Sequence, residues 1–210
     1  MNRLLVLRLS ALGDVIHTIP AVVALRDAIR PAAVSWVVEA PYAELVEIVA
    51  GVEAIPIRMR KWGKSLRASR RDIAAAVRSM RRCDASVDFQ GLIKSAMLGV
   101  LAGARVRYGF DADALKEKPS LLFTNERIDV RRQGHVIEWN LDLASGVAPI
   151  LRDVDVDFTP FAADPGGKLG ELAGAVVLLP GAGKPDKLWP LERFREVARR
   201  IGPAAVAVWG

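Results

Sequence analysis

The sequence predicts an α/β protein with a doubly wound parallel sheet, from three observations. Several short apolar runs lack the polar alternation of half-exposed strands, which is typical of strands covered on both faces. These runs alternate with segments of helical periodicity, as in successive β-α-β units. The same alternation begins again near residue 175. The predicted strands span residues 4–9, 33–38, 85–88 and 106–108, and the predicted helices span residues 21–29, 42–49, 71–80, 92–101 and 134–144.

The chain has 210 residues, of which 51% are apolar, enough for one large or two small domains. A stretch rich in Pro, Gly and Asp, residues 146–170, indicates a passage between domains. We therefore predict a first domain over residues 1–158 and the start of a second, incomplete one over 159–210. The second would hold strands at 175–179 and 204–208 around a helix at 191–201. Two strands and one helix cannot cover both faces of a sheet, so this part should need a packing partner.

The first strand leads into the most informative segment, residues 8–20. Gly13 permits a tight turn just beyond the strand, which is where open α/β sheets bind their ligands. Pro20 predicts that the next helix begins near Thr18 or is kinked there, with Asp14 and His17 before its body. Asp14 is a candidate general base, although Asp is also a preferred helix cap and His17 could simply pack on the first turn.

Residues 58–82 carry ten Lys or Arg and one acid, Asp72, so this segment has a net charge of +9 and the rest of the chain −3, within a total of +6. A solvated helix face, a nucleic-acid surface or a site for an anionic lipid head group would each use such cations. The segment holds one aromatic residue, Trp62, so it lacks the stacking platforms of single-strand binders.

A glycine turn, Gly181-Ala182-Gly183-Lys184, follows the strand predicted at 175–179. Its backbone amides could bind a phosphate, or the turn could be a plain connection. Pro185 excludes a Walker A motif, and the G-x-G-x-x-G spacing of dinucleotide-binding proteins is absent. The single cysteine, Cys83, excludes an internal disulfide and fits a reducing compartment. No apolar run approaches the roughly 18 residues of a transmembrane helix, and no secretory leader pattern opens the chain, so we expect a cytoplasmic protein.

Three segments in the same order resemble the type I lipopolysaccharide heptosyltransferases of glycosyltransferase family 9: residues 10–20, residues 88–96 and Lys187-Leu188-Trp189-Pro190. The resemblance implies a glycosyltransferase B fold with an acceptor-binding first domain and a donor-binding second one. It implies inverting transfer of L-glycero-D-manno-heptose from ADP-heptose to a Kdo residue of Kdo2-lipid A, at the anionic cytoplasmic face of a Gram-negative inner membrane. It implies no cofactor or metal, and no nucleic-acid partner.

The resemblance also assigns roles to residues. Asp14 matches the base, Lys187 the lysine at the donor diphosphate, and Ala182 and Gly183 donor contacts that lack the family's hydroxyls and so must use their backbone. Gln90 and Lys94 have an alternative reading as a turn residue and an exposed helix residue. Lys116 stands where relatives usually have arginine, so a point charge would replace a bidentate contact. The implied acceptor-binding residues are Ser10, Gly13, His17, Arg58, Arg60, Lys61, Lys64, Gln90, Lys94 and Lys116.

Relatives continue beyond the position of Gly210 with an Asp-Thr-Gly-type motif and a nearby His that grip the nucleotide sugar. We therefore expect the 210 residues to represent a carboxyl-truncated chain that is inactive by itself. A non-catalytic acceptor-binding module is the main alternative. A Rossmann dehydrogenase is a third, against which the missing G-x-G-x-x-G counts.

Overall fold

The computed structural model describes residues 1–80, 83–130, 133–157, 159, 172–181 and 187–208, without the side chains of Arg60 and Leu66. Contacts group the chain into two compact units, Met1–Phe161 and Ala162–Gly210. The predicted boundary at 158/159 lies close to this division, but the assignment of one domain to each substrate stays a prediction.

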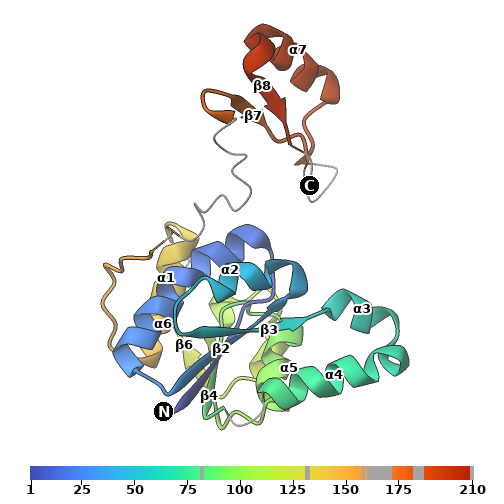
Figure 1. Cartoon of the computed structure of the whole chain (residues 1–210). Helices are drawn as coiled ribbons and strands as arrows, with labels where there is room; N and C mark the ends of the chain where they lie inside the picture. The colour runs from blue at the N-terminus through green and yellow to red at the C-terminus, as the bar shows by residue number, and fades with distance from the viewer. Residues whose placement is uncertain (81–82, 131–132, 158, 160–171, 182–186, 209–210) are drawn as a thin grey trace. The chain divides into compact units, whose positions relative to one another are not determined.

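The first unit holds a six-stranded parallel sheet in the order β3-β2-β1-β4-β5-β6 (Figure 1). This order reverses direction at β1, as in doubly wound folds, so the predicted fold class is confirmed. The strands are β1 (Arg3–Leu7), β2 (Ala33–Glu39), β3 (Val52–Ile57), β4 (Ala85–Asp88), β5 (Val106–Phe110) and β6 (Glu126–Ile128).

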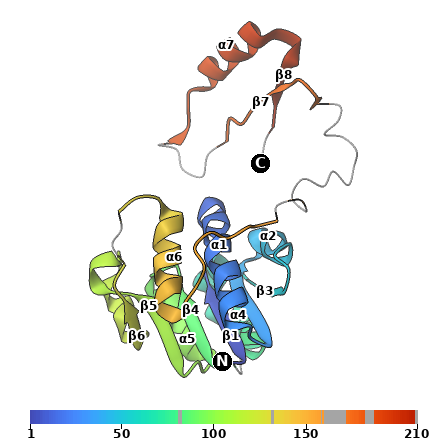
Figure 2. The same cartoon turned by 90° about the vertical axis from the view of Figure 1, so that its left-hand side faces the viewer.

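Helices cover both faces of this sheet: α1, α2 and α6 lie on one face, and α3, α4 and α5 on the other (Figures 1 and 2). Successive residues of β1 enter opposite cores, because side chains alternate along a strand. Leu4 and Val6 join the first core, and Leu5 and Leu7 join the second. The helices are α1 (Leu12–Ile29), α2 (Ala43–Glu47), α3 (Met59–Lys64), α4 (Leu66–Met80), α5 (Ile93–Leu101) and α6 (Val136–Val147), with 3₁₀ turns at Ala40–Tyr42, Ala112–Ala114 and Lys118–Leu122.

Helix α1 corrects the prediction for the first segment. It begins at Leu12, not near Thr18, and it continues through Pro20, so Asp14 and His17 lie in its first two turns. An internal proline removes a hydrogen bond at a cost of about 3 kcal/mol. Most residues between Val15 and Leu25 are buried, and this apolar packing offsets that cost.

The second unit begins as predicted, with two parallel strands and one amphipathic helix. β7 (Val176–Leu178) pairs with β8 (Ala205–Ala207), and α7 (Leu191–Ile201) precedes the 3₁₀ turn Gly202–Ala204. Val176 and Val177 are 45% and 46% exposed. This unit thus leaves apolar strand residues in contact with water. Whether it is stable without a packing partner stays a prediction.

Candidate functional site

The two predicted site segments of the first unit meet at the carboxyl ends of β1 and β4, where the strand order reverses. Leu7 and Asp88 are register partners, and the Phe89 amide extends the pairing by donating to the Leu7 carbonyl at 3.0 Å. Beyond that point the Gln90 side chain takes over: its Oε1 accepts from the Leu9 amide at 2.8 Å and from the Ser10 amide at 3.3 Å. Gln90 therefore ties the segment at residues 88–96 to the segment at residues 10–20.

Asp88 holds this junction in shape from inside the protein. It is 2% exposed, and its carboxylate accepts from the Gln90 amide at 2.9 Å, the Gly91 amide at 3.2 Å and the Ser95 hydroxyl at 2.9 Å. Burial raises the pKa of Asp88 to about 6, although these hydrogen bonds and the charge of Arg8 oppose the rise. Asp88 is thus a positioning residue for the Gln90 loop.

Replacing Asp88 by Asn should remove a pH dependence of folding. With a pKa near 6 in the folded protein against an ordinary 3.8, the folded state binds more protons between pH 4 and pH 6. The wild type should lose about 3 kcal/mol of unfolding free energy relative to Asp88→Asn as pH rises through that window. Urea denaturation at several pH values measures this difference.

Asp84→Asn is the control of opposite sign. The amides of Arg3 and Asn2 hold the pKa of exposed Asp84 below its usual range, so the wild type should lose stability relative to that variant as pH falls. If the difference in unfolding free energy between wild type and Asp88→Asn does not change with pH, Asp88 does not have a raised pKa in the folded protein.

Gly91 allows the loop to turn beside the site. Its φ is +67°, and a Cβ there would lie 2.9 Å from Cδ2 of Leu115 and 3.4 Å from the Phe110 ring. Gly91→Ala should therefore lower the unfolding free energy by about 1–3 kcal/mol. Gly103→Ala is a matched control, because Gly103 has φ +76° but open space around a Cβ. Alanine at this position therefore adds backbone strain without a steric contact. If urea denaturation gives the same loss of unfolding free energy for Gly91→Ala and Gly103→Ala, the contact of the new Cβ with Leu115 does not destabilise the protein.

Asp14 lies in the first turn of α1 and is held from two sides. Its Oδ2 accepts from the Ala11 amide at 3.3 Å, which is half of a capping box, and forms an ion pair with Arg8 at 3.0 Å. The Asp14 side chain is 45% exposed, whereas that of Arg8 is 10% exposed. Arg8 also donates to the Phe89 carbonyl. Burial lowers the pKa of Arg8, although the negative charge of Asp14 opposes this change. This geometry is therefore compatible with both roles predicted for Asp14, helix cap and general base.

Two hollows at this edge of the sheet bring predicted residues together. The first, which we call the Asp14 hollow, has a volume of about 250 Å³ and includes Arg8, Asp14, Gln90 and Lys116. The second, the Ser10 hollow, has a volume of about 470 Å³ and includes Ser10, Lys64, Gln90 and Lys94. The two share Gln90 and Leu92. A carboxylate thus lies beside a polar amide and several cations, an arrangement suited to deprotonating a hydroxyl on an anionic molecule.

Helix α6 completes the Asp14 hollow with Val136, Trp139 and Asn140, which were not predicted. Asn140 joins α6 to α1, because its Nδ2 donates to the His17 carbonyl at 2.9 Å and to the Thr18 hydroxyl at 3.2 Å. His17 does not line either hollow; its ring packs edge-on against His135 at 5.0 Å. The hydrogen bonds of Asn140 link positions more than 120 residues apart, so local sequence patterns contain no trace of them.

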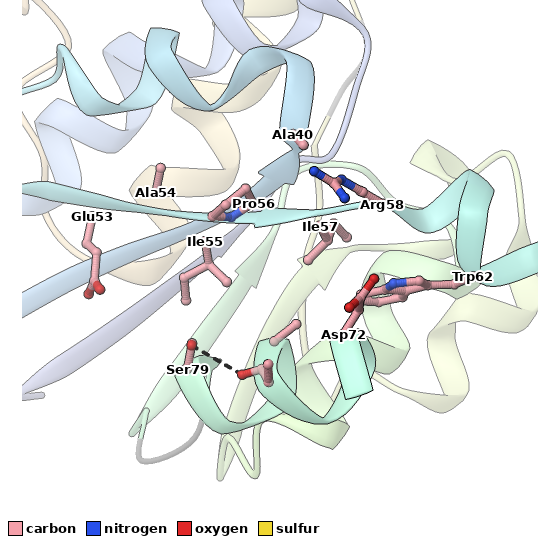
Figure 3. Close-up of a pocket in the computed structure, with 12 residues that line it drawn as sticks. Ala40, Glu53, Ala54, Ile55, Pro56, Ile57, Arg58, Trp62, Asp72 and Ser79 are labelled. Carbon is pink, nitrogen blue, oxygen red and sulfur yellow. Dashed lines mark hydrogen bonds between the residues drawn. The ribbon is translucent and has the colours of Figure 1, made fainter. Parts of the chain in front are cut away.

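The other predicted acceptor residues are dispersed. Gly13 is exposed in the first turn of α1, and exposed Lys61 pairs with Asp72 at 3.3 Å. Arg58 lines a separate pocket of about 330 Å³ between β3 and α4, together with Trp62 and Asp72 (Figure 3). The backbone of Arg60 belongs to α3, but its side chain lies outside the described residues. Arg58 and Lys61 therefore line neither the Asp14 hollow nor the Ser10 hollow, and their acceptor-binding role stays a prediction.

The predicted donor residues belong to the second unit. Lys187 is exposed ahead of α7, while Ala182 and Gly183 lie outside the described residues. Over the described part of the chain, we find no group of three or more His, Cys, Asp or Glu side chains arranged for a metal ion. None of the described helices is long and apolar enough to cross a membrane.

The fold and the site define a doubly wound α/β protein with its polar residues at the topological switch point. Residues 73–209 match glycosyltransferase family 9 (heptosyltransferase). The chain is 30% identical to lipopolysaccharide heptosyltransferase 1 of Escherichia coli K12 over 99% of its own length and 68% of that protein. The chain therefore belongs to glycosyltransferase family 9, and the predicted family and enzyme class are confirmed.

Solved structures agree with this assignment. The E. coli heptosyltransferase WaaC with ADP superposes with a TM-score of 0.83 at 27% identity, over 99% of this chain and 68% of that one. WaaC with ADP-2-deoxy-2-fluoro heptose gives 0.79 at 26% identity, over 99% and 69%. The glycosyltransferase B fold is thus confirmed, and the chain spans about two-thirds of the length of these relatives.

Proposed function

We propose that this protein transfers L-glycero-D-manno-heptose from ADP-heptose to a Kdo hydroxyl of Kdo2-lipid A, with inversion at the anomeric carbon. The observation that carries the proposal is the Asp14 carboxylate, held by Arg8 and the start of α1 in a hollow beside Gln90 and Lys116. The relatives named lipopolysaccharide heptosyltransferase 1 and the WaaC complexes with ADP and with a fluoro-heptose donor support the substrate class.

The proposed reaction is a single displacement. Asp14 takes the proton of the acceptor hydroxyl while the oxygen of that hydroxyl attacks the anomeric carbon from the face opposite ADP. The bond to the β-phosphate oxygen breaks, and ADP leaves with the bonding electrons. The side chain of Lys187 and the amides around Gly181 to Gly183 would stabilise the charge that develops on the phosphate, without a metal or other cofactor.

The acceptor side of the proposal uses the cations of the first unit. Lys116 in the Asp14 hollow, and Lys64 and Lys94 in the Ser10 hollow, would pair with carboxylates and phosphates of the acceptor. The exposed cations of α4 would face anionic lipids on the cytoplasmic side of the inner membrane, where each contributes about 1 kcal/mol near the surface. These cations support the proposal that the enzyme binds the membrane as a peripheral protein.

The test is a transfer assay with ADP-heptose and Kdo2-lipid A, using purified protein that includes a complete donor-binding domain. Mass spectrometry should show the addition of one heptose, and nuclear magnetic resonance of the product should show the anomeric configuration opposite to that of the donor. Retained configuration would contradict a single displacement. Acceptor binding without transfer, in protein that also binds ADP, would favour the non-catalytic acceptor-binding module.

A further inference from the structure

Three helices on the α4 face of the sheet border an apolar groove of about 240 Å³. Each helix contributes side chains at helical spacing: Met59 and Trp62 from α3, Ile73 and Val77 from α4, and Met97 and Leu101 from α5. Residues three or four apart lie on one side of a helix, so these pairs form three stripes that face a common groove.

The groove opens to solvent although its lining is apolar. Met97 and Leu101 are 41% and 47% exposed, while Trp62 at 6% and Leu98 at 3% form a floor that belongs to the core under the sheet. Scattered exposed apolar residues are ordinary, but apolar side chains that line a concave surface mark a place for an apolar ligand.

The groove is continuous with the Ser10 hollow. Met59, Gly63 and Lys94 line both, so the apolar groove adjoins a hollow that holds the polar side chains of Ser10, Lys64 and Gln90. The surrounding helices carry exposed cations, of which Lys64, Arg67, Arg70 and Arg71 follow one another along α3 and α4. An anionic head group with an attached hydrocarbon chain matches this sequence of surfaces.

We propose that the groove binds one acyl chain of the lipid acceptor while the anionic head group occupies the Ser10 hollow. The inference rests on the proposed function for the identity of the acceptor. A lipid would then be recognised by its chain as well as by its sugar, with the chain drawn out of the bilayer between α3, α4 and α5.

The first test uses n-alkyl phosphates of increasing length, below their critical micelle concentrations, in calorimetric titrations of the full chain. Binding should tighten about fourfold per methylene until the groove is filled and then level off. The double variant Met97→Gln/Leu101→Gln should lose this dependence on chain length. Val100→Gln is the matched control, because Val100 is 45% exposed on the same helix but does not line the groove. A double variant that keeps the wild-type length dependence would overturn the proposal.

The second test separates the acceptor from the bilayer. The double variant should bind acylated acceptor at least tenfold more weakly but bind fully deacylated acceptor as the wild type does. If it instead loses adsorption to phosphatidylglycerol vesicles while its titrations with alkyl phosphates match those of wild type, the surface contacts the bilayer and the proposal fails. If the transferase assay fails but the binding of alkyl phosphates still depends on chain length, the proposed function is removed. The groove then remains a site for the hydrocarbon chain of an anionic lipid.

Discussion

Replacing Asp14 by Asn, in protein that includes a complete donor-binding domain, should reduce kcat for heptose transfer by roughly two to four orders of magnitude, the usual contribution of a general base. Asn has the same shape and can still accept the hydrogen bond from the Ala11 amide that Asp14 accepts at 3.3 Å. It cannot take the proton of the acceptor hydroxyl. Acceptor binding should stay within a few-fold of wild type, because the cations of both hollows remain in place.

Asp27→Asn is the control for the Asp14 variant. Asp27 lies on the same helix, is 61% exposed and pairs only locally with Arg26 at 2.7 Å, so its loss should leave kcat unchanged. Circular dichroism and urea denaturation establish that both variants are folded. A kcat for Asp14→Asn within tenfold of wild type would remove Asp14 from the role of base.

The interior strands could be predicted from the sequence, whereas the edge strands could not. β1, β2 and β4 are buried on both faces. β1 and β2 show nearly continuous apolar runs, whereas β4 also buries the polar residues Ser86 and Asp88. β3 contains Pro56 and exposed Glu53, and β6 contains exposed Glu126 and Arg127. Edge strands tolerate proline and charge because one side of the backbone needs no hydrogen-bond partner. The residues that suit β3 and β6 to a sheet edge are therefore the same ones that prevented their prediction as strands.

The basic segment shows what composition can and cannot predict. Its charge correctly indicated a cationic surface, because charge depends only on which residues are present. Which cations reach the site depends on the direction of each side chain along α3 and α4. Lys64 lines the Ser10 hollow, Lys61 turns to Asp72, and Arg58 lies in the pocket beside β3. The resemblance located the segment, but only the packing of α3 and α4 sorts its members.

Arg8 is a further site residue that sequence reasoning missed, and unlike the residues of α6 it had a detectable signal. An arginine within the strand predicted at residues 4–9, six residues before Asp14, could form an ion pair with that acid across the turn. The structure shows that pair, with Arg8 also holding the Phe89 carbonyl. Arg8 therefore connects the candidate base to the loop of Gln90, and its substitution should affect both.

Arg8→Met should lower the unfolding free energy by about 2–3 kcal/mol and reduce kcat by at least tenfold. The Phe89 carbonyl loses a charged donor, and Asp14 and Asp88 lose a nearby cation. The loss should be smaller than for a fully buried pair, because the side chain of Asp14 is 45% exposed and can turn to water. Arg8→Lys should be intermediate, since a single ammonium reaches Asp14 or the Phe89 carbonyl but not both.

The same variant has a signature that a general loss of stability would not produce. The charge of Arg8 lowers the pKa of Asp88, so Arg8→Met should raise that pKa above about 6. The fall in unfolding free energy with rising pH, which spans roughly pH 4–6 in the wild type, should then extend to higher pH. Urea denaturation of Arg8→Met across pH 4–8 measures this shift, with Arg8→Met/Asp88→Asn as the control that abolishes it. An unchanged pH window would mean that Arg8 acts on Asp14 alone and that the two carboxylates are not coupled through it.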